Sequence, residues 1–265
     1  MLQSHYLQEL KQRKTKMLTD SHCHLVKSLY ENLDEVILAA KEKGITRFFN
    51  IGCNHEENRE IISLIDKYSE MYGIIGIQPS DVTKAEKSHL EFIEQSLNKP
   101  KIIAIGEIGL EYHYGKDTKE EQKIWFEKQL QIAEKNNIPV VIHSRDAAED
   151  TLDILKKYKV KGIVHSFTDS YEIAQEYIKL GFVLGINGVI TFKNSNLKEV
   201  IKKVPLEYIV LETDCPYLTP DPFRGKKNEP KHIFEIANFI SKLKGISLEK
   251  LTEKTNENLA RIFDI

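Results

Sequence analysis

Residues 18–25 read Leu-Thr-Asp-Ser-His-Cys-His-Leu and form the first strand-like segment of the 265-residue chain. Because side chains alternate between the two faces of a strand, His22 and His24 point the same way and Cys23 points to the other face. Two imidazoles with a common direction form half of a site for a divalent metal ion. A single pair of this kind also fits an ordinary surface strand, so the interpretation depends on the later strands.

Helical segments and β-rich runs alternate along the rest of the chain. Residues 32–40 place Leu33, Ile37 and Ala40 on one helical face, and Gly44 ends that segment. Further β-rich runs occupy residues 45–52, 72–77, 101–108, 139–144, 162–167, 182–186 and 208–213. Amphipathic segments at 233–243 and 248–263 complete the pattern.

This alternation predicts an α/β fold, a TIM-like (β/α)₈ barrel in a single domain. About eight β-rich runs are separated by helical segments, and many are apolar at consecutive positions, as strands covered on both faces should be. A doubly wound open sheet is the alternative, but it requires a glycine-rich phosphate loop after the first strand, and residues 21–30 contain no glycine. We expect the barrel to span residues 17–265, preceded by a polar, flexible extension at 1–16.

Composition narrows the class of protein. A hydrophobic content of 41% supports a large core, and a formal net charge of -2 with a pI near 6.5 argues against an overall basic field for nucleic acid. Three scattered cysteines fit a reducing compartment. No apolar run is long enough to cross a bilayer. We therefore expect a cytoplasmic protein without a membrane partner, and no obligate protein partner is evident.

Polar residues end several of the predicted strands. They are His22 and His24 on the first, Glu107 on the fourth, His143 on the fifth, His165 on the sixth and Asp214 on the eighth. Because the carboxyl ends of parallel barrel strands meet at one mouth, these residues become neighbours there. Four histidines and two carboxylates at one mouth predict a site for two divalent metal ions.

A pair of metal ions needs a bridging carboxylate, and Glu107 is suited to this role. We expect His22, His24 and Asp214 to bind one ion together with Glu107, and His143 and His165 to bind the other together with Glu107. Mixed nitrogen and oxygen ligands leave magnesium, manganese and zinc open. Glu212 should face the same side one layer deeper and support the ligands.

Five separated stretches carry a family resemblance. Residues 18–25, 104–110, 141–147, 211–220 and 224–230 resemble, in this order, the motifs of the TatD family of metal-dependent deoxyribonucleases. The resemblance implies a TIM-like barrel and assigns metal binding to the six strand-end residues. The chain departs from the usual pattern at Gln78, where the family commonly has histidine, at Glu111, where it commonly has aspartate, and after His165.

Together these features predict hydrolysis of phosphodiester bonds in DNA, including single-stranded DNA, from an end. Asp214 is expected to orient or deprotonate the attacking water, and Glu107 to bridge the metals. Arg145 and Arg224 are candidate phosphate-binding residues, because a guanidinium binds two phosphate oxygens at once. Gln78 is a further candidate substrate contact.

Residues just beyond the fourth strand are candidates for stacking. His113 is expected to contact the substrate, and with Tyr112 it could stack on a base.

Two other functions fit the same residues. A pair of divalent metals can also support hydrolysis of a cyclic amide, a lactone or an aminoacyl ester. A non-enzymatic protein that binds metal or nucleic acid would keep the barrel and the metals without turnover. Removing a cationic residue such as Arg224 should slow hydrolysis of a charged phosphodiester but barely affect hydrolysis of a small neutral substrate. This difference distinguishes the two kinds of substrate.

Overall fold

Eight parallel strands, ordered β1 to β8, form the sheet of the computed structural model, which describes residues 17–265. They are β1 (Leu18–Cys23), β2 (Ile45–Ile51), β3 (Met71–Ile75), β4 (Ile102–Glu111), β5 (Val140–Arg145), β6 (Gly162–Val164), β7 (Phe182–Ile186) and β8 (Ile209–Leu211). The predicted (β/α)₈ barrel is thus confirmed, and the open doubly wound sheet is excluded. The prediction of a flexible extension at 1–16 lies outside the described residues.

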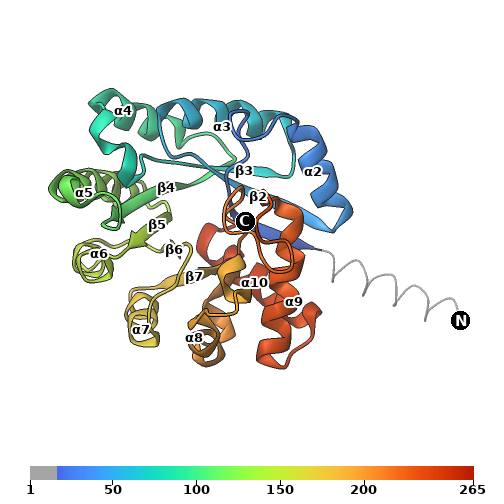
Figure 1. Cartoon of the computed structure of the whole chain (residues 1–265). Helices are drawn as coiled ribbons and strands as arrows, with labels where there is room; N and C mark the ends of the chain where they lie inside the picture. The colour runs from blue at the N-terminus through green and yellow to red at the C-terminus, as the bar shows by residue number, and fades with distance from the viewer. Residues whose placement is uncertain (1–16) are drawn as a thin grey trace, which may run out of the picture.

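Helices alternate with the strands and surround them (Figure 1). The α-helices are α2 (Leu33–Glu42), α3 (His55–Lys67), α4 (Lys87–Ser96), α5 (Lys119–Asn136), α6 (Ala148–Leu155), α7 (Tyr171–Lys179), α8 (Leu197–Lys203), α9 (Ile233–Lys244) and α10 (Leu248–Phe263). Short 3₁₀ helices are η1 (Pro79–Lys84), η2 (Lys116–Thr118), η3 (Gly188–Thr191), η4 (Leu206–Tyr208) and η5 (Pro230–His232). Asn32 caps α2 by accepting a hydrogen bond from the backbone N–H of Glu35, as its position in the sequence predicts.

The barrel closes between β1 and β8 through a few hydrogen bonds at its carboxyl end. The backbone N–H of His24 donates to the carbonyl of Cys215, and the N–H of Asp214 donates to the carbonyl of His22, each at 2.9 Å. The buried Asp20 carboxylate accepts from the N–H of Thr213, also at 2.9 Å. Closure therefore joins the two segments that carry three of the predicted metal ligands.

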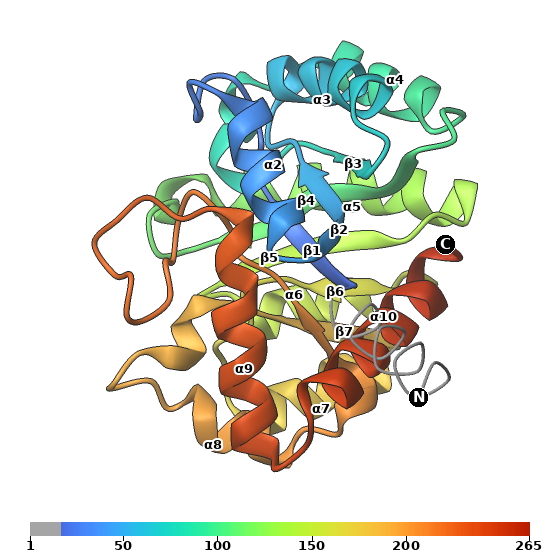
Figure 2. The same ribbon diagram turned by 90° about the vertical axis from the view of Figure 1, so that its right-hand side faces the viewer.

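The amino end of the barrel is filled by α10. Its residues Leu259, Ile262 and Phe263 pack against strand side chains inside the barrel, including Phe49 and Val141. The rings of Phe263 and Phe49 meet edge to face with centroids 5.1 Å apart. Figure 2 shows α10 and the long loop after β8 at opposite ends of the barrel, so the mouth stays open at the other end.

Strand boundaries differ from the predicted runs mainly at the mouth. The fourth strand extends to Glu111, whereas β6 and β8 stop at Val164 and Leu211, before His165 and Asp214.

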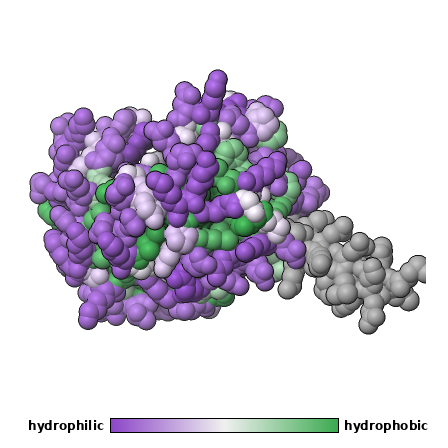
Figure 3. Space-filling view, turned by 90° about the horizontal axis from the view of Figure 1, so that it is seen from below, coloured by the Kyte–Doolittle hydropathy of each residue, from purple (hydrophilic) through white to green (hydrophobic). Residues whose placement is uncertain are grey.

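No helix within residues 17–265 has the length and hydrophobicity needed to span a bilayer. On the face in Figure 3, hydrophobic side chains form small areas separated by hydrophilic ones.

Phe263→Ala should destabilise the barrel, because it removes a ring that is 6% exposed and fills the amino end. A buried Phe→Ala change costs about 3 to 5 kcal/mol of unfolding free energy. Urea unfolding measures this loss. Leu38→Ala, at a side chain 57% exposed on α2, is the matched control and should change stability by less than about 0.5 kcal/mol. Equal effects of the two changes would contradict the role given to α10.

Candidate metal centre

The carboxylate of Glu107 lies between two groups of histidines. Its Oε2 is 3.4 Å from His22 Nε2 and 3.9 Å from His24 Nε2. Its Oε1 is 2.5 Å from His143 Nδ1 and 3.0 Å from His165 Nε2. Each oxygen therefore faces a different imidazole pair, which is the arrangement that a carboxylate bridging two metal ions requires.

Asp214 completes the first group from the segment after β8, which lies next to β1. Its Oδ1 is 3.4 Å from His24 Nε2 and 3.7 Å from His22 Nε2. The rings of His22 and His165 stack with centroids 3.9 Å apart, which brings the two groups into one cluster. The structure thus brings together all six residues that the sequence singled out.

The backbone of Asp214 has a left-handed conformation, with φ 54°. Aspartate tolerates this region better than most residues, because its short polar side chain can satisfy local hydrogen bonds. The segment beyond Leu211 is no longer a strand, and this turn directs the carboxylate towards the histidines of β1.

Outer contacts at hydrogen-bond distance orient His143 and His24, and Glu212 lies near His165 beyond that distance. Glu111 Oε2 lies 3.1 Å from His143 Nε2, and the carbonyl oxygen of Ile51 lies 3.2 Å from His24 Nδ1. Glu212 Oε1 is 3.8 Å from His165 Nδ1 and accepts from the N–H of Ser166 at 2.6 Å. A partner on the second ring nitrogen fixes which nitrogen faces a metal. Glu212 thus lies one layer deeper, as expected.

Two glycines make room for these groups. A Cβ on Gly109, whose φ is +143°, would come within 1.9 Å of the carbonyl oxygen of His143. A Cβ on Gly185 would come within 2.0 Å of Glu212 Oε2. Only glycine allows both the backbone conformation at 109 and the close approach of β4 to β5 beside His143.

Burial and charge act against each other within the cluster. Burial alone would raise the pKa of Glu107, but the neighbouring His165 and His143 hold it well below its usual range. Burial likewise opposes ionisation of Asp214, and His24 and His165 outweigh it and lower the pKa. Burial and the nearby His165 lower the pKa of His22. Glu107 and Asp214 are thus held as carboxylates and His22 as a neutral imidazole, whereas the pKa values of His24, His143 and His165 are raised, so these three would lose a proton when a metal ion binds.

The donor set fits two divalent cations. Three combinations of buried or half-buried residues hold ligand atoms within 4.8 Å of one another: His22 with His24 and Glu107, Glu107 with His143 and His165, and His22 with His165 and Asp214. His22 Nε2 and His24 Nε2 are 3.2 Å apart, and so are His143 Nδ1 and His165 Nε2. Within each of these two pairs, one cation would bind the lone pairs of both nitrogen atoms.

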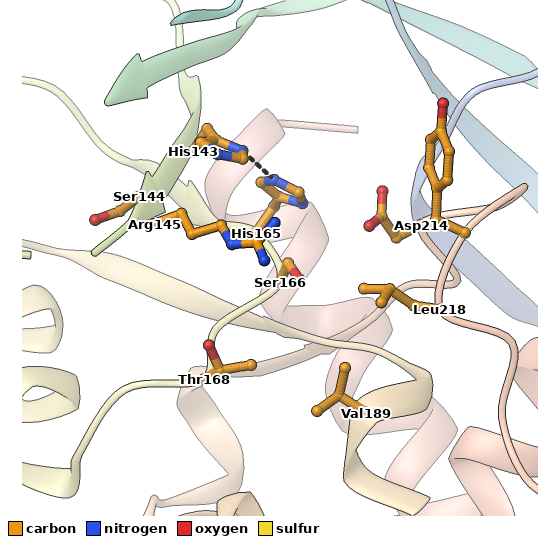
Figure 4. A pocket seen from close by; sticks show the side chains of 10 residues that line it. His143, Ser144, Arg145, His165, Ser166, Thr168, Val189, Asp214 and Leu218 are labelled. Atoms are coloured by element: carbon orange, nitrogen blue, oxygen red, sulfur yellow. Dashed lines mark hydrogen bonds between the residues drawn. The ribbon is translucent and has the colours of Figure 1, made fainter. Parts of the chain in front are cut away.

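A cavity of about 450 Å³ opens beside this cluster (Figure 4). Its lining residues are His143, Ser144, Arg145, His165, Ser166, Thr168, Val189, Asp214, Tyr217 and Leu218. Ligand atoms of His165 and Asp214 lie within 4.8 Å of one another at the border of the cavity, and Arg145 lines it as well. Arg145 therefore adds a positive charge to the cavity that the metal cluster borders.

The other predicted substrate contacts lie farther out. Gln78 donates to Asp81 at 3.2 Å, and exposed His113 contacts Asp146 at 2.9 Å. The guanidinium of Arg224 lies 3.9 Å from the ring centre of Phe192 and does not line the cavity. Their contacts with substrate remain predictions.

The prediction that Tyr112 stacks on a base of the substrate is wrong. Its side chain is buried, and its hydroxyl donates to Asp150 at 2.6 Å, so no ring face is available to a base.

Sequence reasoning missed two neighbours of the cluster. Glu111 was noted only as a departure from the family, although its even spacing from Glu107 along one strand places both on the same face. Cys53 Sγ lies 3.7 Å from His24 Nδ1 and 3.9 Å from Glu107 Oε2. No motif marked this cysteine, because it reaches the cluster from the loop after β2.

Known proteins match nearly the whole chain. The family model described as TatD related DNase matches residues 19–264. The chain belongs to the TatD family. YabD of Bacillus subtilis strain 168, named an uncharacterized metal-dependent hydrolase, is 40% identical over 254 residues, which cover 94% of this chain and 100% of YabD.

Two relatives from Escherichia coli strain K12 extend the comparison. YcfH, also named an uncharacterized metal-dependent hydrolase, is 33% identical over 256 residues, covering 94% of this chain and 96% of YcfH. The crystal structure of the TatD homolog YjjV matches with a TM-score of 0.90 at 25% identity, covering 95% of this chain and 99% of YjjV. This TatD family protein is therefore a metal-dependent hydrolase, and the family resemblance seen in the sequence is confirmed.

Glu107→Gln should weaken metal binding, because an amide has neither the charge nor the second oxygen acceptor of the bridging carboxylate. Elemental analysis should find less metal per chain than in the wild type. A metal ion at a free concentration of 100 times its Kd adds about 2.7 kcal/mol to the free energy of unfolding. Because the variant binds metal more weakly, its Tm should rise less when metal is added. Glu91→Gln on the exposed face of α4 is the control. Unchanged metal content in Glu107→Gln would refute the bridging role.

Proposed function

We propose that this TatD family protein is a deoxyribonuclease that hydrolyses phosphodiester bonds at an end of a DNA strand, using two divalent metal ions. The observation that supports this most is the Glu107 carboxylate, with one oxygen towards each imidazole pair. Arg145 lines the adjoining cavity, where a phosphate next to the cluster would meet its guanidinium. The cytoplasm remains the predicted compartment, on the strength of the cysteine content.

When bound, two divalent cations would supply positive charge to the phosphate oxygens and lower the pKa of a water molecule. Glu107, Asp214 and the four histidines would hold them. Asp214 has a further role, because its side chain is 12% exposed and borders the cavity, against 4% for Glu107. It is the carboxylate that a water in the cavity can reach, and it orients that water and accepts its proton.

The size of the cavity favours a strand end. A volume of about 450 Å³ falls in the lower part of the range for small-molecule sites, roughly 300 to 1,000 Å³, and suits one nucleotide. Val189 and Leu218 form its apolar wall, opposite the histidines (Figure 4). A terminal nucleotide can enter with its sugar against this wall and its phosphate towards Arg145.

Asp214→Asn should lower DNA hydrolysis by roughly 10²- to 10⁴-fold, because the amide cannot accept a proton. Release of labelled nucleotides from single- and double-stranded DNA, with magnesium, manganese or zinc and with or without chelator, measures it. Asp221→Asn in the same loop is exposed and serves as the matched control. Absence of cleavage with every metal, or equal rates in Asp214→Asn and wild type, would refute the nuclease proposal.

Arg145→Ala should raise KM for DNA roughly tenfold, since a hydrogen bond to a charged group contributes about 1.5 to 3 kcal/mol. Arg224→Ala should change KM less, because its guanidinium lies over Phe192 outside the cavity. Steady-state kinetics measure both variants. Hydrolysis of a neutral lactone or cyclic amide that is insensitive to Arg145→Ala and faster than DNA hydrolysis would favour the carbonyl alternative instead.

A further inference from the structure

Two tyrosine rings are exposed at the mouth of the barrel. The side chain of Tyr114 is 77% exposed and that of Tyr217 is 55% exposed. Within residues 17–265 they are the only exposed side chains among phenylalanine, tyrosine and tryptophan. Leaving a large ring in water forgoes the free energy of burying it. Two such rings at one mouth therefore point to a ligand that has flat faces of its own.

Tyr217 is fixed to the β8 side of the metal centre. Its backbone N–H donates to the carbonyl of Asp214 at 2.9 Å, and its own carbonyl accepts from Asn228 Nδ2 at 2.6 Å. The ring lies edge to face with His24, with centroids 6.2 Å apart, and lines the cavity. Its position relative to the metal ligands is therefore set by the backbone.

Tyr114 is fixed to the β4 and β5 side. Its backbone N–H donates to Glu111 at 3.1 Å, and the other oxygen of the same carboxylate lies 3.1 Å from His143 Nε2. The guanidinium of Arg145 lies 4.9 Å from the ring centre of Tyr114, while Arg145 itself lines the cavity. The ring of His113 also meets that of Tyr114 at right angles, with centroids 4.5 Å apart, yet Tyr114 stays 77% exposed and keeps ring surface that a ligand can reach.

Resting on the proposed function, we propose that Tyr114 and Tyr217 bind two successive nucleobases, one on each side of the hydrolysed phosphodiester, by stacking. Tyr217 is bonded to the backbone of Asp214 on the β8 side, Tyr114 is bonded to the Glu111 carboxylate that contacts His143 on the β4 and β5 side, and Arg145 provides the charge for the phosphate between them. Every base has a π face, so this contact tolerates any sequence and requires unpaired bases. The two tyrosines thus select unpaired strand ends without selecting a sequence.

Fluorescence anisotropy of an internally labelled oligothymidylate tests this in the full chain carrying Asp214→Asn, with magnesium present. The comparison strand has abasic residues in place of the nucleotides at both ends. The end that enters the site then lacks its bases whichever end the protein attacks. Tyr114→Ala and Tyr217→Ala should each weaken binding of the normal strand roughly tenfold. Neither should weaken binding of the abasic strand further, because the partner base is already missing. Phenylalanine at either position should restore tight binding, and Leu38→Ala is the surface control.

The outcomes separate the two proposals. Alanine variants that bind the normal strand as tightly as the parent, or that weaken the normal and abasic strands equally, would overturn the stacking inference even if the wild type cleaves DNA. A wild type that cleaves no DNA, and a parent that binds neither strand, would overturn the proposed function and the inference with it.

Discussion

The buried carboxylate of Glu107 is the constraint on which the rest of the site depends. It lies inside the barrel, 3% exposed, and four imidazoles point at its two oxygens. A charge at this depth is costly unless opposite charge or hydrogen bonds compensate it. The cluster can compensate it by protonating histidines or by binding cations. Burial lowers the pKa of His22, whereas the pKa values of His24, His143 and His165 are raised despite their burial, by Cys53 and Asp214 at His24 and by Glu107 at the other two. Protons on these three imidazoles can therefore compensate the carboxylates, and a bound cation would have to displace them.

Closure of the barrel and assembly of the site depend on the same contacts. The hydrogen bonds between β1 and β8 involve the backbones of His22, His24 and Asp214, whose side chains meet in the cluster. The Asp20 carboxylate holds Thr213, the residue before Asp214, by its N–H and by its hydroxyl at 2.5 Å. Loss of these contacts would open the barrel where the ligands meet, so fold and metal binding are coupled here.

Much of this arrangement follows from periodicity in the sequence. Alternation of β-rich and helical segments predicts the barrel, and the polar residues that end apolar strands predict the cluster, because parallel strands share one mouth. Details that depend on the loops could not be obtained in this way. The left-handed backbone at Asp214 and the approach of Cys53 to His24 leave no periodic signal. Nor does strand periodicity distinguish Tyr112, which packs inside, from the exposed Tyr114.

The metal-binding residues lie inside the barrel, and the residues proposed to contact substrate lie at its exposed mouth. Apart from the half-buried His143, the metal cluster and its supports Glu111 and Glu212 are almost completely buried and restrained by strands, so a change there alters metal binding and stability together. The residues proposed to meet substrate, such as Arg145, His113 and Tyr114, lie on exposed loops or at strand ends, where substitutions cost little stability. Gln78 is half-buried and donates to Asp81, and no contact with a residue of the cluster is among its hydrogen bonds in the described part of the chain. Substrate preference can therefore vary among TatD proteins that keep the same metal ligands.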